Sequence, residues 1–104
     1  MTERLVSLND FAQEVHRLAR DNGFYEREEE DSFIGYRLAL IHSEVSEVLE
    51  AYREDAVHKM DEELADIIIR VLDVCAFMGV DIDFWVSEKH EKNKQREKLH
   101  GKVR

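Results

Sequence analysis

Residues 41–80 read IHSEVSEVLEAYREDAVHKMDEELADIIIRVLDVCAFMGV. Apolar residues recur at helical spacing on both sides of a short polar segment, and the chain contains no proline. The pattern predicts two helices, over 32–53 and 59–79, the second ending at Gly79. The residues expected to be buried are Ile34, Leu38, Ile41, Val45, Val48, Leu49 and Tyr52 in the first helix, and Leu64, Ile67, Ile68, Val71, Leu72 and Cys75 in the second.

Two further helices are expected outside this stretch. One should cover 8–22, with Ser7 as its N-cap and Gly23 as its stop, and the other 82–98. Four amphipathic helices with short connections predict an all-α, four-helix bundle, with residues 1–104 forming a single domain. Because the helix over 59–79 is apolar on more than one face, we expect oligomerisation to complete the bundle, as a homodimer or a homotetramer.

The charge balance and the cysteine count narrow the class of protein. Twenty-four acidic residues against 15 Lys and Arg give a net charge of −9, which disfavours binding to a nucleic-acid polymer. The most apolar stretch, 64–80, is interrupted by Asp66, Arg70 and Asp73, so no membrane span is expected. The single cysteine, Cys75, cannot form an internal disulfide, and a cytoplasmic protein is therefore predicted.

Two pairs of carboxylates stand out on the two central helices. Glu44 and Glu47 are three residues apart, and so are Glu63 and Asp66, so each pair lies on one helix face at the margin of an apolar stripe. If the helices pack as an antiparallel hairpin, the pairs can face each other. Four converging carboxylates would repel one another, and a hard divalent cation, Mg²⁺ or Mn²⁺, would relieve this.

Two other interpretations of these acids deserve comparison. Either pair taken alone is most simply a solvated helix face, but two pairs on consecutive helices are harder to explain that way. A di-iron carboxylate bundle would need two Glu-x-x-His units, and this sequence offers only the one at Glu97 and His100. A site for a hard divalent cation is therefore the better interpretation.

The motif Glu44-x-x-Glu47, followed after a gap by Glu63-x-x-Asp66, resembles the metal motif of the MazG-like all-α nucleoside triphosphate pyrophosphohydrolases, which include dCTP pyrophosphatases and are related to dimeric dUTPases. The similarity extends through 62–69 and 80–83 to the basic tail, where Lys89, Asn93 and Arg96 are followed by His-Gly-Lys at 100–102. One departure is Ser43, where many members carry a second glutamate, and this leaves the identity of the general base open.

The resemblance implies a Mg²⁺-dependent hydrolysis of a nucleoside triphosphate to the monophosphate and pyrophosphate, in nucleotide-pool house-cleaning. Glu44, Glu47, Glu63 and Asp66 would hold the ion, and Glu44 and Glu47 would also serve catalysis. The substrate-binding residues that it implies are Lys89, Asn93 and Arg96 for the phosphates and sugar, with His16 and Tyr25 for the base. The alternative is a non-catalytic helical interaction module with the same fold.

Overall fold

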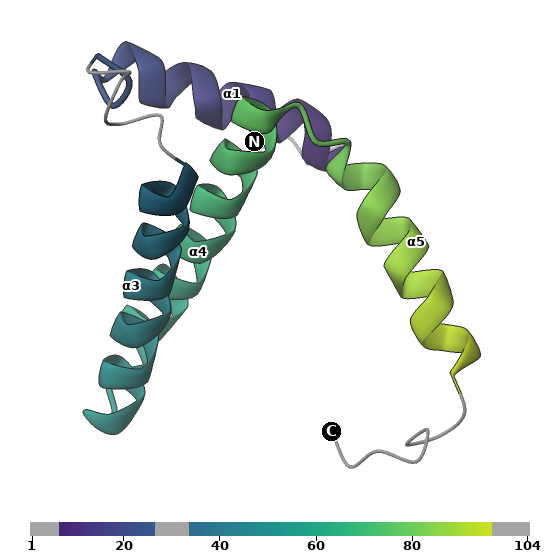
Figure 1. The fold of residues 1–104 in the computed structure, drawn as a ribbon. Helices are drawn as coiled ribbons and strands as arrows, with labels where there is room; N and C mark the ends of the chain where they lie inside the picture. The colour runs from purple at the N-terminus through teal and green to yellow at the C-terminus, as the bar shows by residue number, and fades with distance from the viewer. Residues whose placement is uncertain (1–6, 27–33, 97–104) are drawn as a thin grey trace, which may run out of the picture.

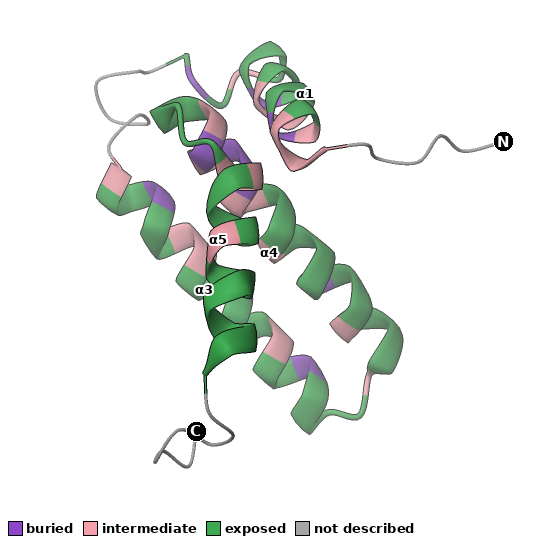
Figure 2. Cartoon of the chain, turned by 90° about the vertical axis from the view of Figure 1, so that its right-hand side faces the viewer, coloured by how far each residue is buried: buried purple, intermediate pink, exposed green. Residues whose placement is uncertain are grey.

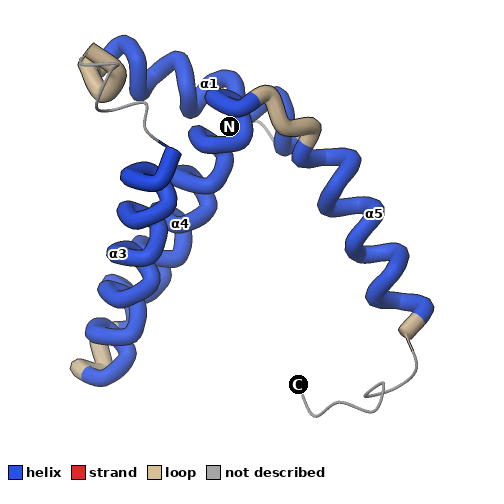
Figure 3. The backbone as a smooth tube through the Cα atoms, viewed as in Figure 1, coloured by secondary structure: helices blue, strands red, loops and turns tan. Residues whose placement is uncertain are grey.

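The computed structural model describes residues 7–26 and 34–96, which form four helices and contain no strand (Figure 3). The helices are α1 (Leu8–Asp21), α3 (Ile34–Arg53), α4 (Val57–Met78) and α5 (Ile82–Gln95). The predicted all-α architecture is confirmed. The helix starts and ends expected at 32 and 98 lie outside the described residues, and α4 begins slightly earlier than expected. Within the described residues, no helix is both long and apolar enough to cross a membrane.

Local sequence explains where the helices start and stop. The Ser7 hydroxyl accepts the backbone N–H of Asp10 at 2.8 Å, which is the predicted N-cap of α1. Gly79 ends α4 with φ of +71°, and Gly23 follows α1 with φ of +88°. Both values lie in the left-handed region that a side chain with a Cβ rarely adopts, so glycine at these positions allows each chain reversal.

α3 and α4 form an antiparallel hairpin, and α1 lies across one end of it against α4 (Figure 1). α5 packs mainly on α1 and extends away from the hairpin. Side chains join the first turns of α1 and α5. The Asp83 carboxylate accepts the backbone N–H groups of Leu8 and Asn9, and the Asn9 amide oxygen accepts the N–H of Ile82. The hydrogen bonds from the backbone of Asn9 and Leu8 lower the pKa of Asp83. Together with the bond between Asn9 and Ile82, they fix where α5 starts.

The hairpin buries less of its apolar surface than the sequence predicts. Ile41 and Val48 are half-buried against α4, but several residues of the expected stripes are exposed to solvent, and Tyr52 is 68% exposed. Figure 2 shows that much of the length of α3 and α4 is exposed. The predicted burial is therefore wrong in this chain for six residues, whereas Leu72 and Cys75 are buried as expected. The six exposed residues are Leu38, Val45, Leu49, Tyr52, Leu64 and Ile68. Together with Val57, these exposed residues form what we call the apolar hairpin face: Leu38, Val45, Leu49 and Tyr52 of α3, and Val57, Leu64 and Ile68 of α4.

The apolar hairpin face lies on the side of the hairpin opposite Glu47 and Asp66. On α3 its members recur at intervals of seven, four and three residues, and on α4 at seven and four, so each set forms a row along its helix. For two antiparallel helices in contact through Glu44 and Glu63, helical geometry places both rows on one side of the hairpin. Glu47 and Asp66 fall on the other side. The two sides thus separate apolar surface from the acidic site.

Candidate metal centre and adjoining pocket

Three of the four predicted acids meet where α3 and α4 pack. Glu44, Glu63 and Asp66 each offer a carboxylate oxygen, and these three atoms lie within 4.8 Å of one another. Glu44 and Glu63 are both only 8% exposed, which is rare for glutamate without a partner. Glu47, one turn after Glu44, is exposed and interacts with Glu63 from the solvent side. The hairpin therefore gathers the acids of both motifs at one level.

Glu63 has the most perturbed ionisation of the group. Burial, followed by hydrogen bonding to Glu44 and Glu47 and repulsion by their charges, raises the pKa of Glu63 to about 7. In the absence of a cation, the cluster thus keeps a proton at Glu63 near neutral pH. That proton relieves the same repulsion that a metal ion would relieve.

We expect the pH dependence of metal binding to follow Glu63. Because its pKa is raised in the folded state, its contribution to the stability of the metal-free protein is full below the unfolded value and is lost as pH rises through about 7. A bound cation needs the ionised carboxylate, so the affinity for Mn²⁺ should rise over the same interval and binding should release a proton. Isothermal titration calorimetry in buffers of different ionisation enthalpy measures both quantities.

The matched variant is Glu63→Gln, which should bind the ion more weakly and lose the pH dependence near neutrality. A wild-type Mn²⁺ affinity that stays constant from about pH 6 to about pH 8 would contradict the assignment of Glu63 to the ion site.

The oxygen donors fit a hard divalent cation. Mg²⁺ holds oxygen ligands at about 2.0–2.1 Å, so ligand atoms on one ion lie roughly 3 to 4 Å apart. The three carboxylate oxygens are within 4.8 Å of one another, close to the spacing that one ion requires. Among the described residues near these acids, Arg70 supplies the positive charge: its Nε donates to Glu44 Oε2 at 2.6 Å. One cation among several carboxylates leaves a net negative site, which could bind a metal ion.

A pocket of about 380 Å³ opens beside the acids, between α1, α3 and α4. Glu44, Asp66 and Arg70 line one part of it, and apolar side chains of α1 and α4 line much of the rest. The full lining is Phe11, Glu14, Val15, Leu18, Ala19, Asn22, Phe24, Arg37, Glu44, Asp66, Ile69, Arg70 and Asp73. Apolar walls with a few converging polar groups are typical of a small-molecule site.

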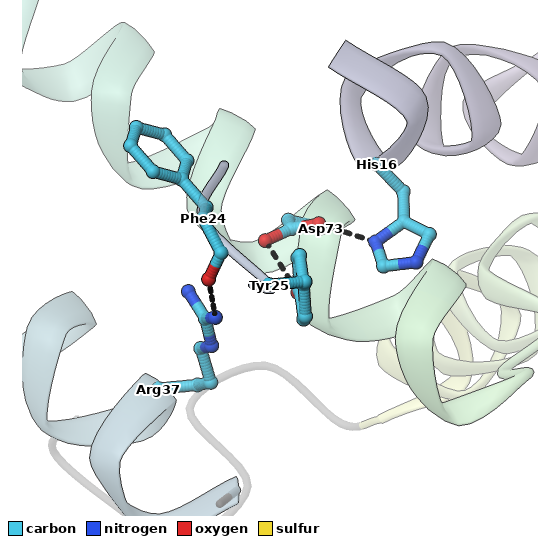
Figure 4. Close-up of polar contacts among 5 residues, drawn as sticks. All are labelled: His16, Phe24, Tyr25, Arg37 and Asp73. Carbon is cyan, nitrogen blue, oxygen red and sulfur yellow. Dashed lines mark hydrogen bonds and ion pairs between the residues drawn. The ribbon is translucent and has the colours of Figure 1, made fainter. Parts of the chain in front are cut away.

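His16 and Tyr25 do not line this pocket but hold Asp73, which does (Figure 4). The His16 imidazole contacts Asp73 Oδ1 through Nδ1 at 2.8 Å, and the Tyr25 hydroxyl donates to Oδ2 at 2.9 Å. The Arg37 guanidinium lies 4.2 Å from the centre of the Tyr25 ring and donates to the carbonyl of Phe24. Burial, then the hydrogen bond and charge of Asp73, raise the pKa of Tyr25, so the hydroxyl keeps its proton and remains a donor.

The basic residues predicted for the phosphates lie on α5, apart from the acids of their own chain. Lys89 and Asn93 line a shallow depression together with Ile82, Trp85 and Val86, and Arg96 follows the last turn. All three polar side chains are exposed. Since α5 packs mainly on α1 and extends away from the hairpin, one chain does not bring Lys89, Asn93 and Arg96 to the carboxylates (Figure 1). His100 and Lys102 lie outside the described residues.

Five polar residues of the pocket lining were missed as site residues by the sequence reasoning: Glu14, Asn22, Arg37, Arg70 and Asp73. Asp66, Arg70 and Asp73 are the charged residues that interrupt the apolar stretch 64–80. Their spacing of four and three residues places them on one face of α4, in line with Glu63. Charges on one face of an otherwise apolar helix could therefore have pointed to these residues.

The MazG nucleotide pyrophosphohydrolase domain matches residues 36–100, which is more than half of the chain. The chain therefore belongs to the MazG nucleotide pyrophosphohydrolase family. The matched region contains both carboxylate pairs, Arg70, Asp73 and all of α4 and α5, whereas α1 precedes it. No curated protein and no solved structure matches the chain.

Proposed function

We propose that this protein hydrolyses a nucleoside or deoxynucleoside triphosphate between its α- and β-phosphates, giving the monophosphate and pyrophosphate. Its role would be the removal of unwanted nucleotides from the cellular pool. The proposal combines the family with one observation, namely that the carboxylate cluster of Glu44, Glu63 and Asp66 borders a pocket large enough for a nucleoside. Triphosphate at the acids and nucleoside in the pocket would place the scissile bond beside the ion site.

The acids would have two roles, binding the metal ion and accepting a proton. Glu44, Glu47, Glu63 and Asp66 would hold Mg²⁺, which when bound neutralises the triphosphate and lowers the pKa of an attacking water; Mn²⁺ is the expected substitute. Glu44 already accepts a hydrogen bond from Arg70, and Glu47 is exposed at the solvent side of the cluster. Glu47 is therefore the better placed of the two to accept the proton of that water, in a chain with Ser43 in place of an additional glutamate.

In the pocket, Asp73 would contact the nucleoside. Its two oxygens are held by His16 and Tyr25, so these two residues would act on the substrate by fixing the orientation of Asp73. Two such contacts keep a buried carboxylate in one rotamer, in which it can accept a hydrogen bond from a base or sugar.

The assembly would be a homodimer or a homotetramer formed through the apolar hairpin face. Seven large apolar residues on one side of a two-helix hairpin are more than a small monomer usually exposes together. Burying them against a second copy would complete a bundle of helices. In such an assembly, Lys89, Asn93 and Arg96 of a second copy could reach the phosphates, which would explain why α5 extends away from its own acids.

The domain would include α1, and it would act on small nucleotides in the cytoplasm. α1 precedes the matched region but packs on α4 and lines the pocket, so residues 1–104 would act as one MazG-like domain. The acidic surface favours a small nucleotide over a nucleic-acid polymer as the partner. A cytoplasmic location agrees with the single buried thiol of Cys75.

The test is the release of pyrophosphate from a panel of ribo- and deoxyribonucleoside triphosphates, with Mg²⁺, with Mn²⁺ and with EDTA. We expect release from at least one nucleotide with either metal and none with EDTA. Product analysis should show monophosphate and pyrophosphate in equal amounts, since cleavage at the γ-phosphate would give diphosphate and phosphate instead. No release from any nucleotide would favour the non-catalytic interaction module, and release that persists in EDTA would contradict the metal dependence.

A further inference from the structure

Arg70 lies between the carboxylate cluster and the Asp73 end of the pocket. On α4 it follows Asp66 by four residues and precedes Asp73 by three, so the three side chains succeed one another along one helix face. All three line the same pocket. A nucleotide with its phosphates at the acids and its nucleoside beside Asp73 would have to pass over Arg70.

The contact with Glu44 uses only part of the guanidinium. The bond at 2.6 Å runs from Nε to Glu44 Oε2, and among the described residues Glu44 is the one hydrogen-bond partner of the Arg70 side chain. A guanidinium carries five N–H donors, so those on the two terminal nitrogens are left for another acceptor. The Arg70 side chain lines the pocket and is 40% exposed, whereas that of Glu44 is only 11% exposed. The buried carboxylate therefore anchors the guanidinium while part of the Arg70 side chain stays accessible.

The site needs a cation at this position for electrostatic reasons. A triphosphate that approaches four carboxylates is repelled wherever the bound ion does not reach, and the phosphate next to the sugar is the one farthest into the pocket. A planar guanidinium presents two parallel N–H groups to phosphate oxygens, a geometry that lysine cannot reproduce. α5, which carries the other basic residues named above, extends away from this site in the same chain.

We propose that Arg70 is a phosphate-binding residue of this site, held in place by Glu44 through Nε and donating to substrate phosphate oxygens through its terminal nitrogens. The proposal rests on the proposed function, because it requires that a triphosphate binds at the carboxylates. Glu44 would then have two roles, because its carboxylate would hold the Arg70 guanidinium and also contribute to the metal-ion site. Arg70 would then couple the metal centre to the nucleoside pocket.

The experiment measures the binding of two probes separately in the full chain. Calorimetry gives the affinity for Mn²⁺ alone, and then the affinity for inorganic triphosphate in the presence of saturating Mn²⁺. For Arg70→Met we expect triphosphate affinity to fall about 10- to 100-fold, which is the usual effect of losing hydrogen bonds to a charged group. The affinity for Mn²⁺ alone should not fall, because removing a neighbouring positive charge favours a cation.

Two further variants separate phosphate binding from a structural role. Arg70→Lys keeps the charge but not the paired donors, so it should recover only part of the lost triphosphate affinity. Arg53→Met removes the same charge from an exposed position in the last turn of α3 and should leave both affinities at wild-type values. Circular dichroism and a melting curve without metal establish that each variant is folded.

The outcomes are distinct. Unchanged triphosphate affinity in a folded Arg70→Met protein overturns the role of Arg70 while the proposed function stands. A fall in Mn²⁺ affinity that accounts for the whole loss of triphosphate binding also overturns it, since Arg70 would then only orient Glu44. If the wild type binds Mn²⁺ but no triphosphate and releases no pyrophosphate from any nucleotide, the proposed function fails and this inference fails with it.

Discussion

Replacing Glu47 by glutamine or Asp66 by asparagine is expected to abolish turnover while the fold is kept. Each change removes one negative charge and one oxygen donor from a cluster that repels itself in the metal-free protein. The metal-free variants should therefore melt at the wild-type temperature or slightly above it. Losing a residue that contacts the ion should cost at least about 100-fold in rate, beyond the loss typical of residues that only support a ligand.

Thermal shift measurements with and without Mg²⁺ accompany the rate measurements. Mg²⁺ should raise the melting temperature of the wild type and do so much less for the two variants, because a ligand stabilises only the state that binds it. Glu50→Gln should have a milder effect, since Glu50 lies one turn beyond Glu47 and is exposed. Glu54→Gln, the same change at an exposed position after the last turn of α3, is the matched control. Turnover of substrate by Glu47→Gln at the wild-type rate would exclude the four-carboxylate site.

Replacing Leu49 by lysine should convert the proposed homodimer or homotetramer to monomers at micromolar concentration. Leu49 lies in the apolar hairpin face, and an interface around a two-fold axis would receive the introduced charge from both copies. Each copy loses a burial of about 1.5–3 kcal/mol and adds a charge to an apolar contact. Light scattering coupled to size-exclusion chromatography measures the mass, and lysine is compatible with the helix.

The control for this change is Ser46→Lys, which places the same charge on an exposed position of α3 outside the apolar hairpin face. It should leave the mass unchanged. If Leu49→Lys yields folded monomers, pyrophosphate release by those monomers tests whether α5 of a second copy serves the site. A monomeric mass for the wild type itself would show that the apolar hairpin face has another purpose.

Part of the site could be predicted from sequence because its residues are related locally. Glu44 and Glu47 share one helix face through their spacing, and so do Glu63 and Asp66, whatever the helices pack against. A short polar connection between two helices leaves few arrangements other than an antiparallel hairpin, which brings the two pairs to one level. The cluster of Glu44, Glu63 and Asp66 in the structure follows from these local relations.

The apolar pattern could not distinguish the core of one chain from a surface for another. Val48 and Leu49 are adjacent and equally apolar, yet Val48 is half-buried against α4 while Leu49 is 48% exposed. Which residues are buried depends on how each helix of the hairpin is rotated about its own axis. Glu44 and Glu63 occupy part of the contact between α3 and α4. Acidic residues are normally expected on the solvent side of a helix. The apolar pattern therefore predicts a helix contact centred on the apolar residues, whereas the contact in the structure includes Glu44 and Glu63.

The sequence by itself determined the four helices, the Ser7 cap of α1, the end of α4 at Gly79 and the two carboxylate pairs, because each depends on residues within a turn or two of one another. Only the tertiary structure decided that Arg70 contacts Glu44, that His16 and Tyr25 hold Asp73, and that α5 extends away from the acids. The contacts of Arg70 and Asp73 join residues 26 to 57 positions apart. The Arg70 contact arises from the packing of α3 on α4, and those of Asp73 arise from how α1 and the residues after it cross the hairpin. Helical periodicity fixes the face on which a side chain lies, but the partner on that face is set by the packing of whole helices.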